Sequence, residues 1–201
     1  VLYLCSHLCE VPEVLKEEKW IPLFVKDTGG AYLRVSAESH ITRLNMPQEG
    51  NQKWGASRVH KSRVNSLPQM LQEAWYALWA GFSYSGSEKV GEIQFYLCKN
   101  MNEEFSLKSV AEKYHFSEPY FCTLFKKGTG MSVIHFVQHV RVHYGTYLIR
   151  NSEKKLQEIA EEVGFENYSY FGKLFKRYVG QTPEAYREGS EGKLGQYRTE
   201  K

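Results

Sequence analysis

The stretch LQEIAEEVGFENYSYFGKLFKRYVGQTPEAYR, residues 156–187, decides the fold of this chain. Apolar residues recur in it at helical spacing on both sides of Gly164, which suits a tight turn between two helices. Residues 107–130, LKSVAEKYHFSEPYFCTLFKKGTG, carry the same pattern. The offset between the copies is 49 residues before the turn (Leu107 to Leu156) and 50 after it, so the second turn has one extra residue. The repeat predicts two copies of one structural unit.

Each copy has the features of a helix-turn-helix motif. In the first copy, the small side chain of Ala111 allows the second helix to cross closely, and Phe116 fills the turn. Ser117 is expected to cap the second helix. The buried face of that helix is expected to comprise Phe121, Leu124 and Phe125.

In the second copy, Gly164 takes the turn position of His115, and Phe165 fills the turn. Between the copies, residues 133–149 predict one long helix, about 25 Å in length. Such a helix can fix the two motifs relative to each other. Its expected apolar stripe is Ile134, Val137, Val140, Tyr144 and Leu148.

The first part of the chain predicts mixed secondary structure. Strands are expected at residues 1–5, 21–25 and 54–59, with one or two more within 31–44 and a helix over 11–20. Another helix begins near Leu67, with Ser66 as its cap and Pro68 in its first turn. The polar segment Phe82–Ser87 is the best linker candidate.

The expected fold class is therefore α+β. Residues 1–86 form a small mixed α/β regulatory or linker domain, which is expected to be incomplete because the chain begins in mid-strand. Residues 87–188 form an all-α domain with two helix-turn-helix motifs joined by a long helix. Residues 189–201 are expected to be a flexible tail.

Composition excludes several classes of protein. An apolar fraction of 42% and a net charge of +3 over 201 residues fit a globular chain, and the charge alone does not identify a partner. The sequence contains no signal peptide and no apolar run long enough to cross a membrane, so a cytoplasmic location is expected. Cys5 and Cys9 flank His7, but no second pair has ligand spacing, so we expect reduced thiols, no metal and no cofactor.

The exposed faces of the two second helices are the candidate DNA-binding surface. Small and polar groups near the start of each helix can approach base edges, and the cations near its end suit phosphates. A charge run is usually a solvated face, but here it recurs at the same point of both copies. The predicted DNA-binding residues are Ser117, Pro119, Tyr120, Cys122, Thr123, Lys126, Lys127, Asn167, Tyr168, Ser169, Gly172, Lys173, Lys176 and Arg177.

With these motifs, residues 90–187 resemble the AraC/XylS family of transcription regulators. The resemblance rests on Leu124–Lys127 with Gly130, on Arg141, and above all on residues 159–187. It implies that Cys122 and Thr123 read bases in the first copy. In the second copy it assigns the same role to Ser169, Gly172 and Lys173. Only Lys173 has strong base-reading chemistry, as a donor to guanine, so the second copy is expected to discriminate better.

Two residues depart from the family pattern. Gly145 lies where the family usually has alanine, and glycine within a helix costs up to about 1 kcal/mol, so the connecting helix is expected to be locally softer. Pro119 suits the first turn of a helix but removes one backbone donor.

The N-terminal part resembles the end of the degenerate GGDEF-like module of some two-component response regulators. The resemblance is carried by Gly55–Arg58, Leu67–Pro68 and Glu73–Leu78. No GG(D/E)EF signature is present, so cyclase activity is not expected, and no receiver domain lies within the chain.

Together, these features predict a sequence-specific, double-stranded DNA-binding transcription regulator, an activator rather than an enzyme. RNA polymerase is its expected protein partner, and a homodimer through the N-terminal part or an upstream domain is a further expectation. Membrane binding is not expected. Two alternatives remain: a DNA-repair methyl-acceptor regulator with a zinc-bound cysteine, of which Cys5 and Cys9 would supply half a cluster, and a small-molecule-sensing regulator.

Overall fold

The computed structural model describes residues 2–5, 20–23, 30–34, 54–58 and 67–189. The chain divides into two compact units, Val1–Phe95 and Tyr96–Lys201. The division falls within helix α3 (Glu88–Lys99), which therefore contributes residues to both units. Residues 11–19 of the helix expected over 11–20, the cap Ser66 and most of the predicted tail lie outside the described residues, whereas Trp20 belongs to a strand and not to a helix.

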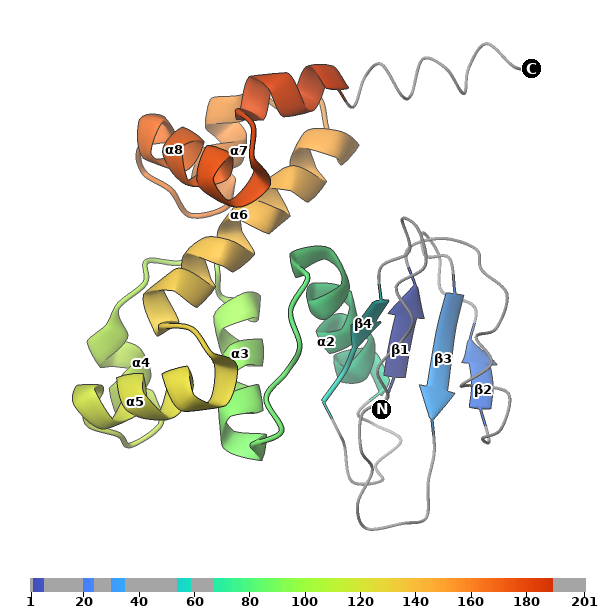
Figure 1. Cartoon of the computed structure of the whole chain (residues 1–201), viewed down its shortest axis with the longest axis vertical. Helices are drawn as coiled ribbons and strands as arrows, with labels where there is room; N and C mark the ends of the chain where they lie inside the picture. Colours follow the sequence, from blue (N-terminus) through green and yellow to red (C-terminus); the bar gives the residue numbers. More distant parts are fainter. Residues whose placement is uncertain (1, 6–19, 24–29, 35–53, 59–66, 190–201) are drawn as a thin grey trace. The chain divides into compact units, whose positions relative to one another are not determined.

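The first unit contains an antiparallel sheet in the order β2-β3-β1-β4 (Figure 1). Its strands are β1 (Leu2–Cys5), β2 (Trp20–Leu23), β3 (Gly30–Arg34) and β4 (Trp54–Ala56). All four lie at or near the predicted strand positions, and the mixed α/β character of residues 1–86 as a whole stays a prediction.

Helix α2 (Leu67–Ala80) packs against β1 and β4. The contact with β4 is close at Gly55, where an added Cβ would lie 2.1 Å from the carbonyl oxygen of Ala74 and 2.3 Å from the nitrogen of Leu78. Only glycine fits at this approach of strand to helix. Met70, Ala74 and Leu78 form the buried face of α2.

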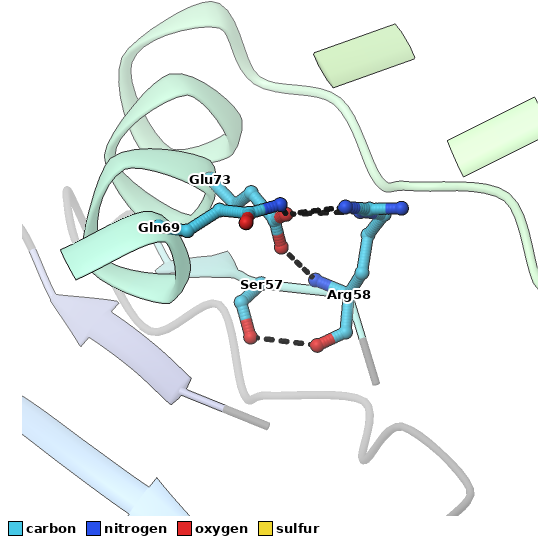
Figure 2. Close-up of polar contacts among 4 residues, drawn as sticks. All are labelled: Ser57, Arg58, Gln69 and Glu73. Atoms are coloured by element: carbon cyan, nitrogen blue, oxygen red, sulfur yellow. Dashed lines mark hydrogen bonds and ion pairs between the residues drawn. The ribbon is translucent and has the colours of Figure 1, made fainter. Parts of the chain in front are cut away.

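A buried ion pair joins the end of β4 to α2 (Figure 2). The Glu73 side chain has no exposed surface, and its carboxylate accepts from the Arg58 backbone N–H, Nε and Nη2, each at 2.9 Å. The Gln69 side-chain amide also donates to it at 2.9 Å. The Arg58 guanidinium lies 5.9 Å from the centre of the Phe95 ring in α3. One carboxylate therefore satisfies donors from the segment that follows β4 and from α2.

The segment between α2 and α3, expected to be a linker, is held by hydrogen bonds. The side-chain amide of Gln94, which is 1% exposed, accepts from the N–H of Ser85 at 2.7 Å and donates to the carbonyl of Ser83 at 3.3 Å. Tyr84 between them is buried. The short polar segment is therefore fixed on α3 by one buried side chain.

The second unit is helical, as predicted. Its first motif comprises α4 (Leu107–Lys113) and α5 (Glu118–Thr129), and its second comprises α7 (Leu156–Glu162) and α8 (Tyr168–Val179). The long helix α6 (Val133–Asn151) lies between them, two residues longer than expected at its C-terminal end (Figure 1). Residues 183–189 are helical as well.

Aromatic side chains form the cores of both motifs, as their spacing predicted. Phe121 and Phe125 are fully buried in the first motif, and Phe171 and Phe175 in the second. Leu174 is buried, whereas its equivalent in the first copy, Leu124, is only half-buried. The prediction that Leu124 belongs to the buried face of α5 is therefore only partly correct.

The predicted stripe of α6 is only partly correct. Val137, Val140 and Leu148 are buried, but Ile134 is 49% exposed. Helix α6 contacts α5 as well as α7 and α8, so it needs more than one buried face, and its buried residues also include Val133, Phe136, Val142, Gly145 and Ile149.

Gly145 does not simply soften α6. A Cβ at this position would lie 3.1 Å from two atoms of the Phe171 ring. The glycine thus lets α8 approach closely, which offsets part of its cost to the helix.

Removing the Glu73 carboxylate should strongly destabilise the first unit. We expect Glu73→Ala to lower its free energy of unfolding by about 3–5 kcal/mol, because the Arg58 guanidinium would lose its buried partner. All four tryptophans lie between residues 20 and 79, so tryptophan fluorescence in a denaturant titration reports on this unit. Glu92→Ala, which breaks the exposed 3.7 Å pair with Lys89, is the control and should cost less than about 1 kcal/mol. Equal losses would contradict this account of the buried pair.

Candidate nucleic-acid interface

Helices α5 and α8 are the candidate recognition helices. Their C-terminal ends are alike, and their N-terminal ends differ. Gly130 and Gly180 end them in left-handed conformation, with φ of 80° and 88°. At its start α8 is capped by Asn167, whose side chain accepts from the Tyr170 N–H at 3.1 Å. Ser117 occupies the N-cap position of α5 but makes no side-chain hydrogen bond there. The prediction that its side chain caps α5 is therefore wrong. Pro119 in the first turn leaves one fewer donor to satisfy.

Most of the predicted DNA-binding residues are exposed. Cys122, Tyr168 and Gly172 are half-buried. The exposed ones are Ser117, Pro119, Tyr120, Thr123, Lys126, Lys127, Asn167, Ser169, Lys173, Lys176 and Arg177.

Cationic side chains lie in the last turn of each recognition helix. Lys126 and Lys127 occupy this place in α5, and Lys176 and Arg177 occupy it in α8. Cations near a helix C-terminus also stabilise the helix, so their position alone does not require DNA. Their recurrence on exposed surface at equivalent points gives the two helices a matching charge pattern.

The side chains near the start of α5 offer little for reading bases. The Thr123 hydroxyl donates to the Pro119 carbonyl at 2.9 Å within its own helix, which leaves it only as an acceptor. Cys122 is a half-buried free thiol. In α8, by contrast, Lys173 is exposed one turn after Ser169.

Tyr168 is bound within the protein. Its hydroxyl donates to the Glu184 carboxylate, and its ring packs near Phe171, 6.2 Å between centroids. Burial and the Glu184 contact raise the pKa of Tyr168 to about 12, while the same hydrogen bond lowers the pKa of Glu184. This side chain therefore anchors the segment after α8.

Arg141 of α6 fixes the turn that places α8. Its Nε donates to the carbonyl of Met101 at 2.6 Å, Nη1 to that of Gly164 at 2.7 Å, and Nη2 to that of Glu103 at 2.7 Å. Its guanidinium lies 5.6 Å from the centre of the Phe165 ring, and burial lowers its pKa from the usual value.

Gly164 and His115, which the repeat aligns, both have positive φ in their turns. The φ angles are 88° at Gly164 and 60° at His115, the one non-glycine residue with positive φ among those described. A Cβ at Gly164 would lie 2.9 Å from the Arg141 guanidinium carbon and from the Met101 carbonyl oxygen. The second turn thus requires glycine for space as well as for conformation.

A groove of about 820 Å³ lies beside the start of α8. Loop residues 102–105, the first half of α6 and the second turn form its walls. Its lining includes Gln138, Ser169, Tyr170 and Lys173.

Sequence reasoning did not include Tyr170 and Gln138 among the candidate site residues. Tyr170 is 48% exposed on α8, and its hydroxyl accepts from the side-chain amide of Gln138 at 2.8 Å. The available signal was the repeat itself, because Tyr170 aligns with Tyr120, which was included.

The described residues contain no group of three His, Cys, Asp or Glu side chains able to hold a metal ion. Cys98 is a buried free thiol whose pKa is raised by burial. His7 and Cys9 lie outside the described residues.

None of the helices described has both the length and the apolar character to span a bilayer.

Comparison with known proteins agrees with this geometry. Residues 110–189 match the family model of a helix-turn-helix domain, which is the class that the fold and the paired helices define. The chain is 37% identical over 105 residues to the bifunctional transcriptional activator/DNA repair enzyme AdaA of Bacillus subtilis, covering 52% of this chain and 50% of that protein. The chain thus spans about half the length of this curated relative.

Two solved structures have the same fold. The C-terminal domain of AraT, a response regulator from Geobacillus stearothermophilus, is 32% identical, with a TM-score of 0.50 over 51% of this chain and 86% of that chain. The DNA-binding domain of the global transcriptional factor AdpA, solved with a target DNA, has a TM-score of 0.52 at 24% identity, over 55% of this chain and 99% of that chain. The family model, AdaA and AraT support the AraC/XylS resemblance of the C-terminal half, and the AdpA likeness shows the fold alone. The GGDEF-like resemblance stays a prediction.

Gly164→Ala should destabilise the second unit more than an alanine at an open left-handed position. The backbone cost of about 1–2 kcal/mol applies at any such position, and the contacts with Arg141 and Met101 add roughly 1–3 kcal/mol. Gly180→Ala is the matched control, since its φ is also 88° and nothing lies within 4 Å of the added Cβ. Denaturant titrations followed by far-ultraviolet circular dichroism measure both. Equal losses would argue against steric restriction at Gly164.

Proposed function

We propose that this chain is the output part of a signal-responsive transcription regulator, an activator, that binds double-stranded DNA in a sequence-specific way. Helices α5 and α8 enter adjacent segments of the major groove on one face of the duplex. One observation carries the proposal. Two helices of equal length, with glycine at the same closing position, present polar groups in the first turns and cations in the last turn on exposed surface.

Helix α6 supplies the spacing that this arrangement needs. With 19 residues it is about 28 Å long, close to the roughly 34 Å that separates successive major-groove segments. Arg141 links its middle to the turn before α8. The two recognition helices are therefore presented on one connected frame.

The two helices have unequal tasks in this proposal. Lys173 is the principal base-reading residue, a donor to guanine O6 or N7, with Ser169 beside it. Gly172 has no side chain, so it lets the backbone of α8 come close to the DNA. In α5, Thr123 and Cys122 discriminate weakly. The four cations of the last turns bind phosphates and supply affinity that does not depend on sequence.

The wider setting rests on the resemblance and the relatives. AraT is described as a response regulator and AdaA as a transcriptional activator, which favours activation under control of a signal, in a two-component system or otherwise. RNA polymerase is then the expected protein partner, and the N-terminal part or an upstream domain the place for a homodimer. We expect a regulator that binds chromosomal DNA to lie in the cytoplasm.

AdaA also carries a DNA-repair activity in its name. We do not extend that activity to this chain, because the match covers 52% of it and the paired helices already account for a DNA-binding role. We therefore propose a regulator and not an enzyme.

Affinity for duplex DNA should depend steeply on salt. Each phosphate neutralised by a lysine or arginine releases counterions, so the logarithm of the affinity should fall linearly with that of the salt concentration, with a slope of about −0.9 for each contact. Fluorescence anisotropy of labelled duplexes measures the slope, and selection from a random DNA pool supplies a preferred site. An affinity that does not change with salt would reject the DNA-binding function.

Lys173→Ala should reduce affinity for the selected site by roughly 1–3 kcal/mol and affinity for random duplexes much less, since a base contact distinguishes sequences. Lys108→Ala is the control, because Lys108 is an exposed lysine of α4, outside the recognition helices. If Lys173→Ala weakened both DNAs equally, Lys173 would be a phosphate contact and not a base reader.

A further inference from the structure

Two exposed tyrosines occupy equivalent places in the two copies. Tyr120 is the third residue of α5, and Tyr170 is the third residue of α8. They are 56% and 48% exposed. Both are large aromatic side chains held at the surface of the first turn, beside the residues proposed to approach the base edges.

Each tyrosine ring is held by the residue that fills its turn. Tyr120 lies against Phe116, with 5.2 Å between ring centroids, and Tyr170 lies against Phe165, with 6.0 Å between them. The packing limits the freedom of each ring and leaves its phenol end accessible. Amphipathic side chains of this kind are favoured at interfaces, where the ring packs and the hydroxyl binds a partner.

The hydroxyl of Tyr170 is also oriented. Gln138 of α6 donates its side-chain amide hydrogen to the Tyr170 oxygen at 2.8 Å. A phenol has one hydrogen to donate, and accepting from Gln138 does not use it. The contact therefore holds the oxygen and leaves the O–H of Tyr170 free to donate to another group.

A DNA phosphate at the start of α8 can accept this hydrogen bond. The N-terminal ends of helices favour negative charge, and Tyr170 lies in the first turn of α8. Four carboxylates, those of Glu103, Glu104, Glu161 and Glu166, also line the groove, so the groups in it that favour a phosphate are Lys173, Arg141 and the start of α8. A DNA phosphate that approaches α8 as Lys173 enters the major groove meets these groups.

We propose that Tyr170 donates a hydrogen bond to a DNA backbone phosphate, that Gln138 positions it, and that Tyr120 makes the equivalent contact in the first copy. The inference rests on the proposed DNA-binding function. It identifies a pair of uncharged backbone contacts that set the register of each recognition helix. Phosphate contacts of this kind position a protein on the duplex without reading its sequence.

Tyr170→Phe and Tyr120→Phe test the proposal, because each removes one hydroxyl and keeps the ring packed. Affinity should fall about tenfold for each variant, and by the same factor on the selected site and on random duplexes. The salt slope should stay unchanged, since no cation is removed, whereas Lys176→Ala should reduce it by about one. Tyr147→Phe, an exposed tyrosine of α6 outside both recognition helices, is the matched control and should bind as the unmodified protein does.

The role of Gln138 is tested by a double-mutant cycle. Gln138→Ala alone should weaken binding to both DNAs, but it should add no loss in the Tyr170→Phe background, because it acts through that hydroxyl. Circular dichroism melting curves should be alike for all variants.

Unchanged affinity in either phenylalanine variant, or a loss confined to the selected site, would overturn the proposal. A fully additive loss in the cycle would remove the positioning role of Gln138. If the unmodified protein bound no duplex DNA at all, the proposed function itself would fail, which is a separate result.

Discussion

The structure of the helical unit depends on the Arg141 guanidinium. From the middle of α6 it binds backbone carbonyls at the entry to the first motif, Met101 and Glu103, and at the turn of the second, Gly164. Although burial lowers its pKa, an arginine stays protonated at any physiological pH, so these bonds persist across that range. Hydrogen bonds to a charged donor are stronger than those between neutral groups, and here three of them join segments 23 to 40 residues apart in sequence.

The two motifs are similar in backbone and unequal in chemistry. Both have a turn residue at positive φ, a phenylalanine that fills the turn and a glycine that ends the second helix. Yet α8 has a hydrogen-bonded cap, a fully formed core and an exposed Lys173, whereas α5 has an unsatisfied cap position and a half-buried Leu124. In the proposed function, this difference suits a division in which α8 selects the site and α5 adds affinity.

Much of the helical unit could be predicted from the sequence because its signals are local. The repeat gave the motif boundaries, the extra turn residue and the glycine positions, and the helical period gave the phenylalanine core. What could not be predicted depends on contacts between distant elements. No pattern indicates that Arg58 donates to the buried carboxylate of Glu73, or that Gln138 contacts Tyr170 across 32 residues. Sequence also cannot show that α6 packs on several sides, which is why Ile134 was wrongly expected to be buried.

The short segment between α2 and α3 has a consequence for how a signal could travel. A flexible linker lets the helix on one side of it rotate without moving the helix on the other side. Gln94 holds the backbone of Ser83 and Ser85 directly on α3, and Arg58 extends from β4 over Phe95 of the same helix. Within the first unit, the end of α2 and the start of α3 are therefore joined by a segment with its own hydrogen bonds and not by a free tether.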